Sequence, residues 1–165
     1  MRNMCDGRNS LWVLLAVIGM TVAGMGGRST LALEPLTMIK DINQGEVPPP
    51  TFWLAEMGGN LYFANGTPGY GVELWKSDGT PGGTAMVLDI NPSSSSSLPS
   101  DLKVMGSKLY FSAGEEAHGQ EIWVSDGTGA GTQLLKDIVP GLSSSSPRGF
   151  ALLGSTLFFL VPRHT

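Results

Sequence analysis

The chain has 165 residues, a single cysteine and a formal net charge of −4, so it is long enough for one ordinary domain and is mildly acidic. An acidic chain without clusters of Lys or Arg is a poor candidate for binding nucleic acid or an anionic membrane surface. Cys5 lies ahead of the first apolar segment, which leaves the rest of the chain without a thiol for disulfides, thiolate catalysis or cysteine metal sites.

Residues 1–32 have the layout of a secretory signal peptide. Two arginines precede the apolar core 11–23, and small residues follow it. This core matches the about 7 to 15 residues of a signal peptide and is short of the about 20 that span a bilayer. We expect cleavage after Ala32, with cleavage after Gly24 and an uncleaved anchor as the alternatives. Each alternative places the rest of the chain outside the cytoplasm, as a secreted, periplasmic or cell-surface protein without further membrane contact.

Residues 33–50 contain one expected strand at 36–42 and a linker at 43–50 that ends in three prolines. The strand aligns with the end of later repeats and therefore has the character of a partial repeat. Consecutive prolines remove backbone donors and keep the linker extended.

Two full repeats are expected at residues 51–98 and 99–146, and a truncated third repeat at 147–165. Within them, short apolar runs alternate with Gly, Asn, Asp and Pro, a pattern that predicts an all-β fold with four strands per full repeat. The expected strands are 52–57, 61–64, 73–77 and 84–90, then 101–105, 108–113, 121–125 and 131–138, then 150–153 and 156–161. In the first repeat we also expect a tight turn at 58–60 and a glycine-rich loop at 65–71. The serine-rich segments between repeats, 91–99 and 140–147, are expected to be flexible, solvated connectors.

A fixed sequence offset supports this division into repeats. The string E-L-W-K-S-D-G-T-P-G-G-T at residues 73–84 recurs as E-I-W-V-S-D-G-T-G-A-G-T at residues 121–132, an offset of 48 residues (121 − 73). The strings L-Y-F at 61–63, L-Y-F at 109–111 and L-F-F at 157–159 share the same offset. A constant period of about 20 to 50 residues is typical of repeat architectures.

Each residue type in the recurring string has an expected structural role. The Asp-Gly pair predicts a tight corner, in which Gly takes a positive φ and Asp bonds the backbone two residues further on. The tryptophans are expected to fill the gap between neighbouring sheets, with a sugar-stacking platform as the alternative. The motif residues are Glu73, Leu74, Trp75, Asp78, Gly79, Thr80, Gly83 and Thr84, and Glu121, Ile122, Trp123, Asp126, Gly127, Thr128, Gly131 and Thr132.

Metal binding and catalysis receive weaker support from the sequence. Calcium would need six or more converging oxygens, whereas the recurring aspartates each fit a turn or a strand end, so we expect no cofactor and keep calcium as the alternative. Glu115, Glu116 and His118 could bind zinc or move a proton, but their counterparts in the previous repeat are not conserved in type. We therefore expect a variable loop there, and no catalytic residues in the chain.

The repeated residues resemble the bacterial family named for its E-L-W-x-x-D-G-T repeat, whose members are often described as hyalin-like repeat proteins. The resemblance covers about residues 38–161 and implies a secreted or surface-associated, non-catalytic chain with β-propeller-like blades. The export signal and the repeat array together favour a module that binds protein or polysaccharide. A structural extracellular spacer is the alternative, and a fragment of a propeller-type hydrolase or lyase ranks below both.

The number of repeats differs from what the resemblance implies. Propellers close with about 4 to 8 blades, and this chain supplies two full units and two partial ends. We therefore expect a partial β-propeller-like array of four-stranded units, which is either a fragment of a longer protein or a protomer that closes a propeller with copies of itself.

Overall fold

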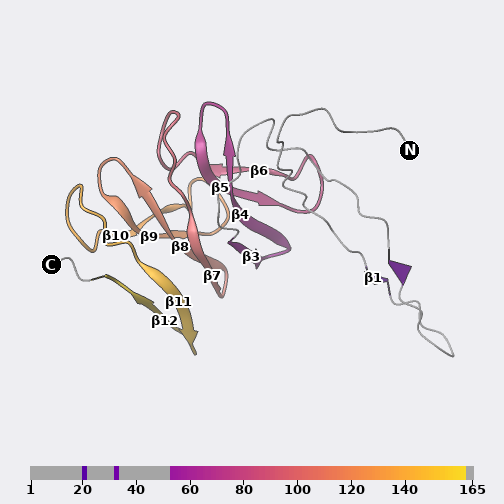
Figure 1. Ribbon diagram of the computed structural model, residues 1–165. Helices are drawn as coiled ribbons and strands as arrows, with labels where there is room; N and C mark the ends of the chain where they lie inside the picture. The colour runs from indigo at the N-terminus through magenta and orange to yellow at the C-terminus, as the bar shows by residue number, and fades with distance from the viewer. Residues whose placement is uncertain (1–19, 22–31, 34–52, 163–165) are drawn as a thin grey trace.

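The computed structural model describes residues 20–21, 32–33 and 53–162 of the chain (Figure 1). Within these residues the fold is all-β, as predicted: the sheets are antiparallel and no helix is present. Accordingly, no described segment has the length and hydropathy of a helix that could cross a membrane. Most of the expected signal peptide, the expected strand at 36–42 and the proline-rich linker lie outside the described residues.

The described strands form two four-stranded meanders and two two-stranded sheets. The first sheet has the order β3-β4-β5-β6, the second β10-β9-β8-β7, and β11 and β12 pair as a two-stranded sheet. The bounds in the first sheet are β3 Leu54–Met57, β4 Asn60–Thr67, β5 Gly71–Ser77 and β6 Ala85–Leu88. In the second they are β7 Ser100–Met105, β8 Lys108–Glu115, β9 Gly119–Ser125 and β10 Gln133–Lys136. The remaining strands are β11 Arg148–Leu153, β12 Thr156–Leu160, β1 Met20–Thr21 and β2 Ala32–Leu33.

Glycine turns set the register of these sheets. Met57 pairs with Asn60, so the β3–β4 loop consists of Gly58 and Gly59, which have φ values of 61° and 77°. Two central residues with positive φ match the twist of the flanking strands in a two-residue hairpin. The tight turn predicted at this position is therefore confirmed.

One expected loop is shorter than predicted. The glycine-rich segment 65–71 was expected to be a loop, but β4 continues to Thr67 and β5 begins at Gly71. Asn65 pairs with Glu73 across the two strands and is buried. The prediction was wrong because Asn and Gly are uncommon in strands, whereas this pair is fully enclosed by tertiary packing.

The main core lies between the two four-stranded sheets. Side chains alternate between the faces of a strand, so Tyr62 and Leu74 share one face of the first sheet. In the second sheet, Phe111 and Trp123 are paired across β8 and β9 and share one face. These four residues belong to a single buried cluster, so the two sheets pack face to face. Its other buried members are Met57, Ile90, Leu102, Leu109 and Ala113.

The first strand of each sheet lies closest to the neighbouring sheet. β3 contacts β7, and β7 in turn contacts β11, so consecutive sheets meet along these strands (Figure 1). Phe150 of β11 is buried and lies 5.5 Å, centroid to centroid, from Phe159 of β12. The β11–β12 hairpin thus continues the order of the two larger sheets.

The two motif tryptophans occupy different environments. Trp123 is 6% exposed and belongs to the core between the sheets, as predicted. Trp75 pairs with Phe63 on the opposite face of the first sheet from Tyr62, and it is only partly buried. The prediction that both tryptophans fill a gap between sheets is thus confirmed for Trp123 alone, because Trp75 faces away from the second sheet.

Candidate functional site between the sheets

The Asp-Gly corner of the first sheet is closed by its own polar side chains. Asp78 Oδ1 accepts hydrogen bonds from the Thr80 backbone N–H at 2.9 Å and from the Thr80 hydroxyl at 2.7 Å. These bonds hold the pKa of the exposed Asp78 carboxyl below its ordinary value. Thr80 Oγ1 accepts from Gly83 N at 2.9 Å, and Ser77 Oγ lies 2.7 Å from Thr84 Oγ1. The bond from Asp78 to the backbone two residues on is the contact predicted from the sequence.

The corner of the second sheet has the same hydrogen bonds, 48 residues further on. Asp126 Oδ1 accepts from Thr128 N at 3.0 Å and from Thr128 Oγ1 at 2.7 Å, and Ser125 Oγ lies 2.7 Å from Thr132 Oγ1. The bonds from Thr128 lower the pKa of the Asp126 carboxyl, and the Lys108 ammonium 3.7 Å away adds to this effect. The motif residues at the corners thus serve the turn itself.

Glu73 is fully buried and joins its strand to the serine connector. Its carboxylate accepts hydrogen bonds from Ile90 N at 3.0 Å, Ser97 N at 2.9 Å and Ser97 Oγ at 2.5 Å. Burial raises the pKa of this carboxyl above its ordinary value, against the opposing effect of the bonds from Ser97 and Ile90. We call this arrangement the Glu–Ser clasp.

A second Glu–Ser clasp closes the second sheet. Glu121 is also fully buried and accepts from Ile138 N at 3.0 Å, Ser145 N at 2.9 Å and Ser145 Oγ at 2.6 Å. The prediction of solvated serine connectors was therefore wrong at Ser97 and Ser145, which are 1% and 0% exposed, whereas outer residues such as Ser93 and Ser94 are exposed. Each connector is anchored on a carboxylate that lies 24 residues earlier in the chain.

Close backbone approach explains the glycine that starts β5 and β9. Gly71 has a φ of 66°, and an added Cβ would overlap the Ser95 carbonyl oxygen. Gly119 has a φ of 65°, and an added Cβ would press on the Ser144 hydroxyl. Only glycine lets the serine connector pack against the strand at these two positions.

The acidic residues considered for metal binding do not converge. No group of three or more His, Cys, Asp or Glu side chains with metal-binding geometry occurs within the described residues. At the turn between β8 and β9, His118 Nδ1 lies 2.5 Å from Glu115 Oε1, while Glu116 is exposed. This pair spans a single turn of chain at the rim of the sheet, so the structure brings together two of the three residues singled out there.

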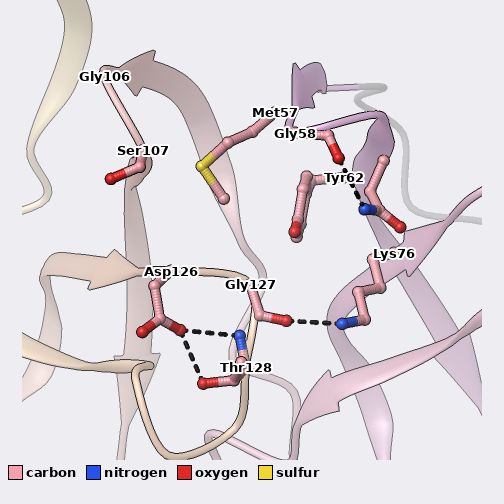
Figure 2. Close-up of a pocket in the computed structure, with 10 residues that line it drawn as sticks. Met57, Gly58, Tyr62, Lys76, Gly106, Ser107, Asp126, Gly127 and Thr128 are labelled. Atoms are coloured by element: carbon pink, nitrogen blue, oxygen red, sulfur yellow. Dashed lines mark hydrogen bonds between the residues drawn. The ribbon is translucent and has the colours of Figure 1, made fainter.

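A cavity of about 390 Å³ opens where the two sheets meet at their corner ends (Figure 2). It is bounded by the β3–β4 turn, the β7–β8 turn and the Asp-Gly corner of the second sheet. Its lining residues are Met57, Gly58, Asn60, Tyr62, Lys76, Gly106, Ser107, Asp126, Gly127 and Thr128. The walls combine an aromatic ring, both signs of charge, hydroxyls and an amide.

Lys76 and Tyr62 fix the corner of the second sheet against the first. Lys76 Nζ donates a hydrogen bond of 2.8 Å to the Gly127 carbonyl, so two residues that line the cavity are joined across the two sheets (Figure 2). Gly127 has a φ of 89°, and an added Cβ would overlap the Tyr62 hydroxyl. Burial raises the pKa of the Tyr62 hydroxyl, and the negative charge of Asp126 adds to this rise. The hydroxyl is thus protonated at neutral pH, well below even its ordinary pKa of 10.0.

Sequence reasoning identified some cavity residues for other reasons and missed others. Asp126, Gly127 and Thr128 were expected as turn residues, whereas Tyr62 and Lys76 were not singled out. One signal was available: Lys76 is polar where its counterpart in the next repeat, Val124, is apolar. A residue that differs in type between equivalent positions of two repeats indicates a contact that only one repeat makes, here with the neighbouring sheet.

Comparisons with known protein families, with curated proteins and with solved structures gave no match to this chain.

Proposed function

We propose that this chain is a non-catalytic binding module of a secreted or cell-surface protein, and that the cavity between the sheets takes a polyhydroxylated ligand such as a saccharide unit. The observation that carries the proposal is the cavity lining. It offers the Lys76 ammonium, the Asp126 carboxylate, the Tyr62 hydroxyl and exposed serine and threonine hydroxyls around about 390 Å³. Binding sites of this size commonly combine an apolar wall with a few fixed polar groups.

The architecture that we propose is a partial β-propeller-like array in the E-L-W-x-x-D-G-T repeat family. Three strands of the second sheet, β8, β9 and β10, begin 48 residues after β4, β5 and β6. The hydrogen bonds of the corners and of the Glu–Ser clasps are offset by the same amount. Contact between consecutive sheets along β3, β7 and β11 is also what a radial arrangement of blades would produce.

A non-catalytic role is supported by how the buried polar groups are used. Glu73 and Glu121 are saturated by hydrogen bonds within their own units, and Asp78 and Asp126 hold turns. Catalytic groups need a nucleophile, base or acid placed with an orienting partner around a reacting atom. These four carboxylates serve the turns and connectors of the fold, so we propose that the ligand is held and left unchanged.

Export is proposed from residues 1–32 alone. Mass spectrometry of the protein recovered from the medium and from the cell surface should find the chain beginning at Leu33. Recovery of the intact first residues with the membrane fraction would instead support the uncleaved anchor.

The cavity proposal is tested by blocking its mouth. Ser107 lies in the exposed β7–β8 turn, and Ser107→Arg would place a long side chain across the opening. Ser155→Arg changes the corresponding residue (155 − 107 = 48) in the β11–β12 turn, away from the cavity, and is the matched control. A glycan array should identify a ligand for the unmodified protein, and calorimetry should show binding lost in Ser107→Arg and kept in Ser155→Arg.

The structural spacer remains the competing function, and the internal bonding of the serine connectors favours it. A spacer should bind nothing on the array, and neither arginine variant should change its behaviour. Equal binding by both variants would also contradict the cavity as the site.

A further inference from the structure

The β11–β12 hairpin presents an apolar face that nothing in the described chain covers. Ala151 pairs with Phe158, and Leu153 pairs with Thr156, so the side chains of this face are fixed by the register. Leu153, Phe158 and Leu160 are 74%, 52% and 67% exposed. We call this surface the hairpin face, made of Ala151, Leu153, Phe158 and Leu160.

The first sheet shows what covers such a face. Met57 and Tyr62 are the counterparts of Leu153 and Phe158, two periods of 48 earlier (153 − 57 and 158 − 62 both give 96). They are 6% and 3% exposed, because the face of the second sheet that carries Trp123 packs on them. The hairpin face is thus of the kind that a tryptophan-bearing sheet buries.

A matching tryptophan-bearing surface lies at the opposite end of the array. The register of β3, β4 and β5 places four apolar side chains, beside the exposed Glu56, on the face of the first sheet that points away from the second sheet. We call this surface the Trp face, made of Leu54, Leu61, Phe63 and Trp75.

The Trp face is incompletely covered where its counterpart is buried. Leu54 is 58% exposed, whereas Leu102, its counterpart in the second sheet (102 − 54 = 48), is 8% exposed. Trp75 is partly buried, whereas Trp123 is 6% exposed. Phe63 is already buried, so the open part of the face centres on Leu54 and Trp75.

We propose that copies of this chain associate head to tail, with the hairpin face of one copy packed on the Trp face of the next. The contact would repeat in trans the packing that joins the two four-stranded sheets in cis. Because the two surfaces differ, the association is heterologous and continues until a ring closes or a filament forms. This inference names a partner for the interaction module proposed above, and it does not depend on the cavity.

Two single substitutions test the two surfaces separately. Phe158→Lys charges the hairpin face and Leu54→Lys charges the Trp face, and both side chains are exposed, so each variant should fold. Leu142→Lys, in the second serine connector and 79% exposed, lies on neither face and is the matched control. Sedimentation velocity on the exported protein, from about 1 to 100 μM, measures the association, and circular dichroism checks the fold.

The expected result is an association that either surface substitution weakens at least about tenfold, while Leu142→Lys leaves it unchanged. Mixing Phe158→Lys with Leu54→Lys in equal amounts should then give a one-to-one dimer, because each variant retains the surface that the other has lost. Such a dimer would not arise from a symmetric contact between two hairpin faces.

Three outcomes would overturn the proposal. The first is an unmodified protein that stays monomeric throughout the concentration range. The second is that both Phe158→Lys and Leu54→Lys associate as well as the unmodified protein. The third is that Phe158→Lys weakens the association while Leu54→Lys leaves it unchanged. None of these outcomes would affect the comparison of Ser107→Arg with Ser155→Arg, so failure of self-association is distinguishable from failure of ligand binding.

Discussion

Replacing each motif tryptophan by alanine should have clearly unequal effects on stability. Trp123 is 6% exposed, and a buried aromatic side chain removes about 200 Å² from water, worth about 5 kcal/mol at about 25 cal/mol per Å². Measured losses for Trp→Ala in cores are about 3 to 5 kcal/mol. Trp75 stands at the corresponding position but is only partly buried, so we expect about 1 to 2 kcal/mol for Trp75→Ala.

Urea unfolding followed by far-ultraviolet circular dichroism measures both losses without relying on tryptophan fluorescence. The two variants control for each other, because they remove the same side chain from equivalent strands. Losses that agree within about 0.5 kcal/mol, or a larger loss for Trp75→Ala, would refute the packing described for the two sheets.

Three further predictions concern the corner and the clasp. Gly83→Ala should lower the free energy of unfolding in urea by about 1 to 3 kcal/mol, because its Cβ would overlap the Asp78 carboxylate. In the control Gly82→Ala the added Cβ meets no atom within 4 Å, so the loss should be well below about 1 kcal/mol. Equal losses would contradict the corner geometry. Ser97→Ala should cost about 1.5 to 3 kcal/mol, since it removes a hydrogen bond to a buried carboxylate, and an unchanged unfolding midpoint would argue against the clasp. The pKa of Glu73 is raised in the folded protein, so proton binding by its carboxyl favours the folded state most at pH values below 4.5, the ordinary pKa of this group. This stabilisation is lost as the pH rises through the raised pKa of the folded protein. Glu73→Gln should therefore cost more stability at pH 4 than at pH 7, and a cost that grows with pH would show that the sign is wrong.

The strand pattern was largely predictable because it depends on local chemistry. Gly58 and Gly59 define a two-residue turn from their own backbone preferences, and Asp78 caps its corner with bonds that reach only two residues along the chain. Strand ends were less well defined, because Asn65 enters β4 through burial and not through propensity.

The rest depended on contacts between distant residues. Ser97 belongs to a run of serines whose composition is typical of a flexible linker, and its burial results from Glu73, which lies 24 residues away. Lys76 bonds to Gly127, which lies 51 residues further along the chain, so no local sequence pattern predicts that these two residues meet in the cavity. Trp75 and Trp123 differ in burial because a neighbouring sheet packs on the face that carries Trp123. Both stand in nearly the same motif, so the motif does not predict which of the two is buried.

The clasp also decides which serines a modifying enzyme can reach. Ser93 and Ser94 are exposed in the first connector, whereas the Ser97 hydroxyl is held by the Glu73 carboxylate and enclosed. A glycosyltransferase or kinase that meets the folded chain would thus find only the outer serines. Attachment of a group to Ser97 would have to precede folding, and it would remove the hydroxyl, one of the three donors that bond to the Glu73 carboxylate.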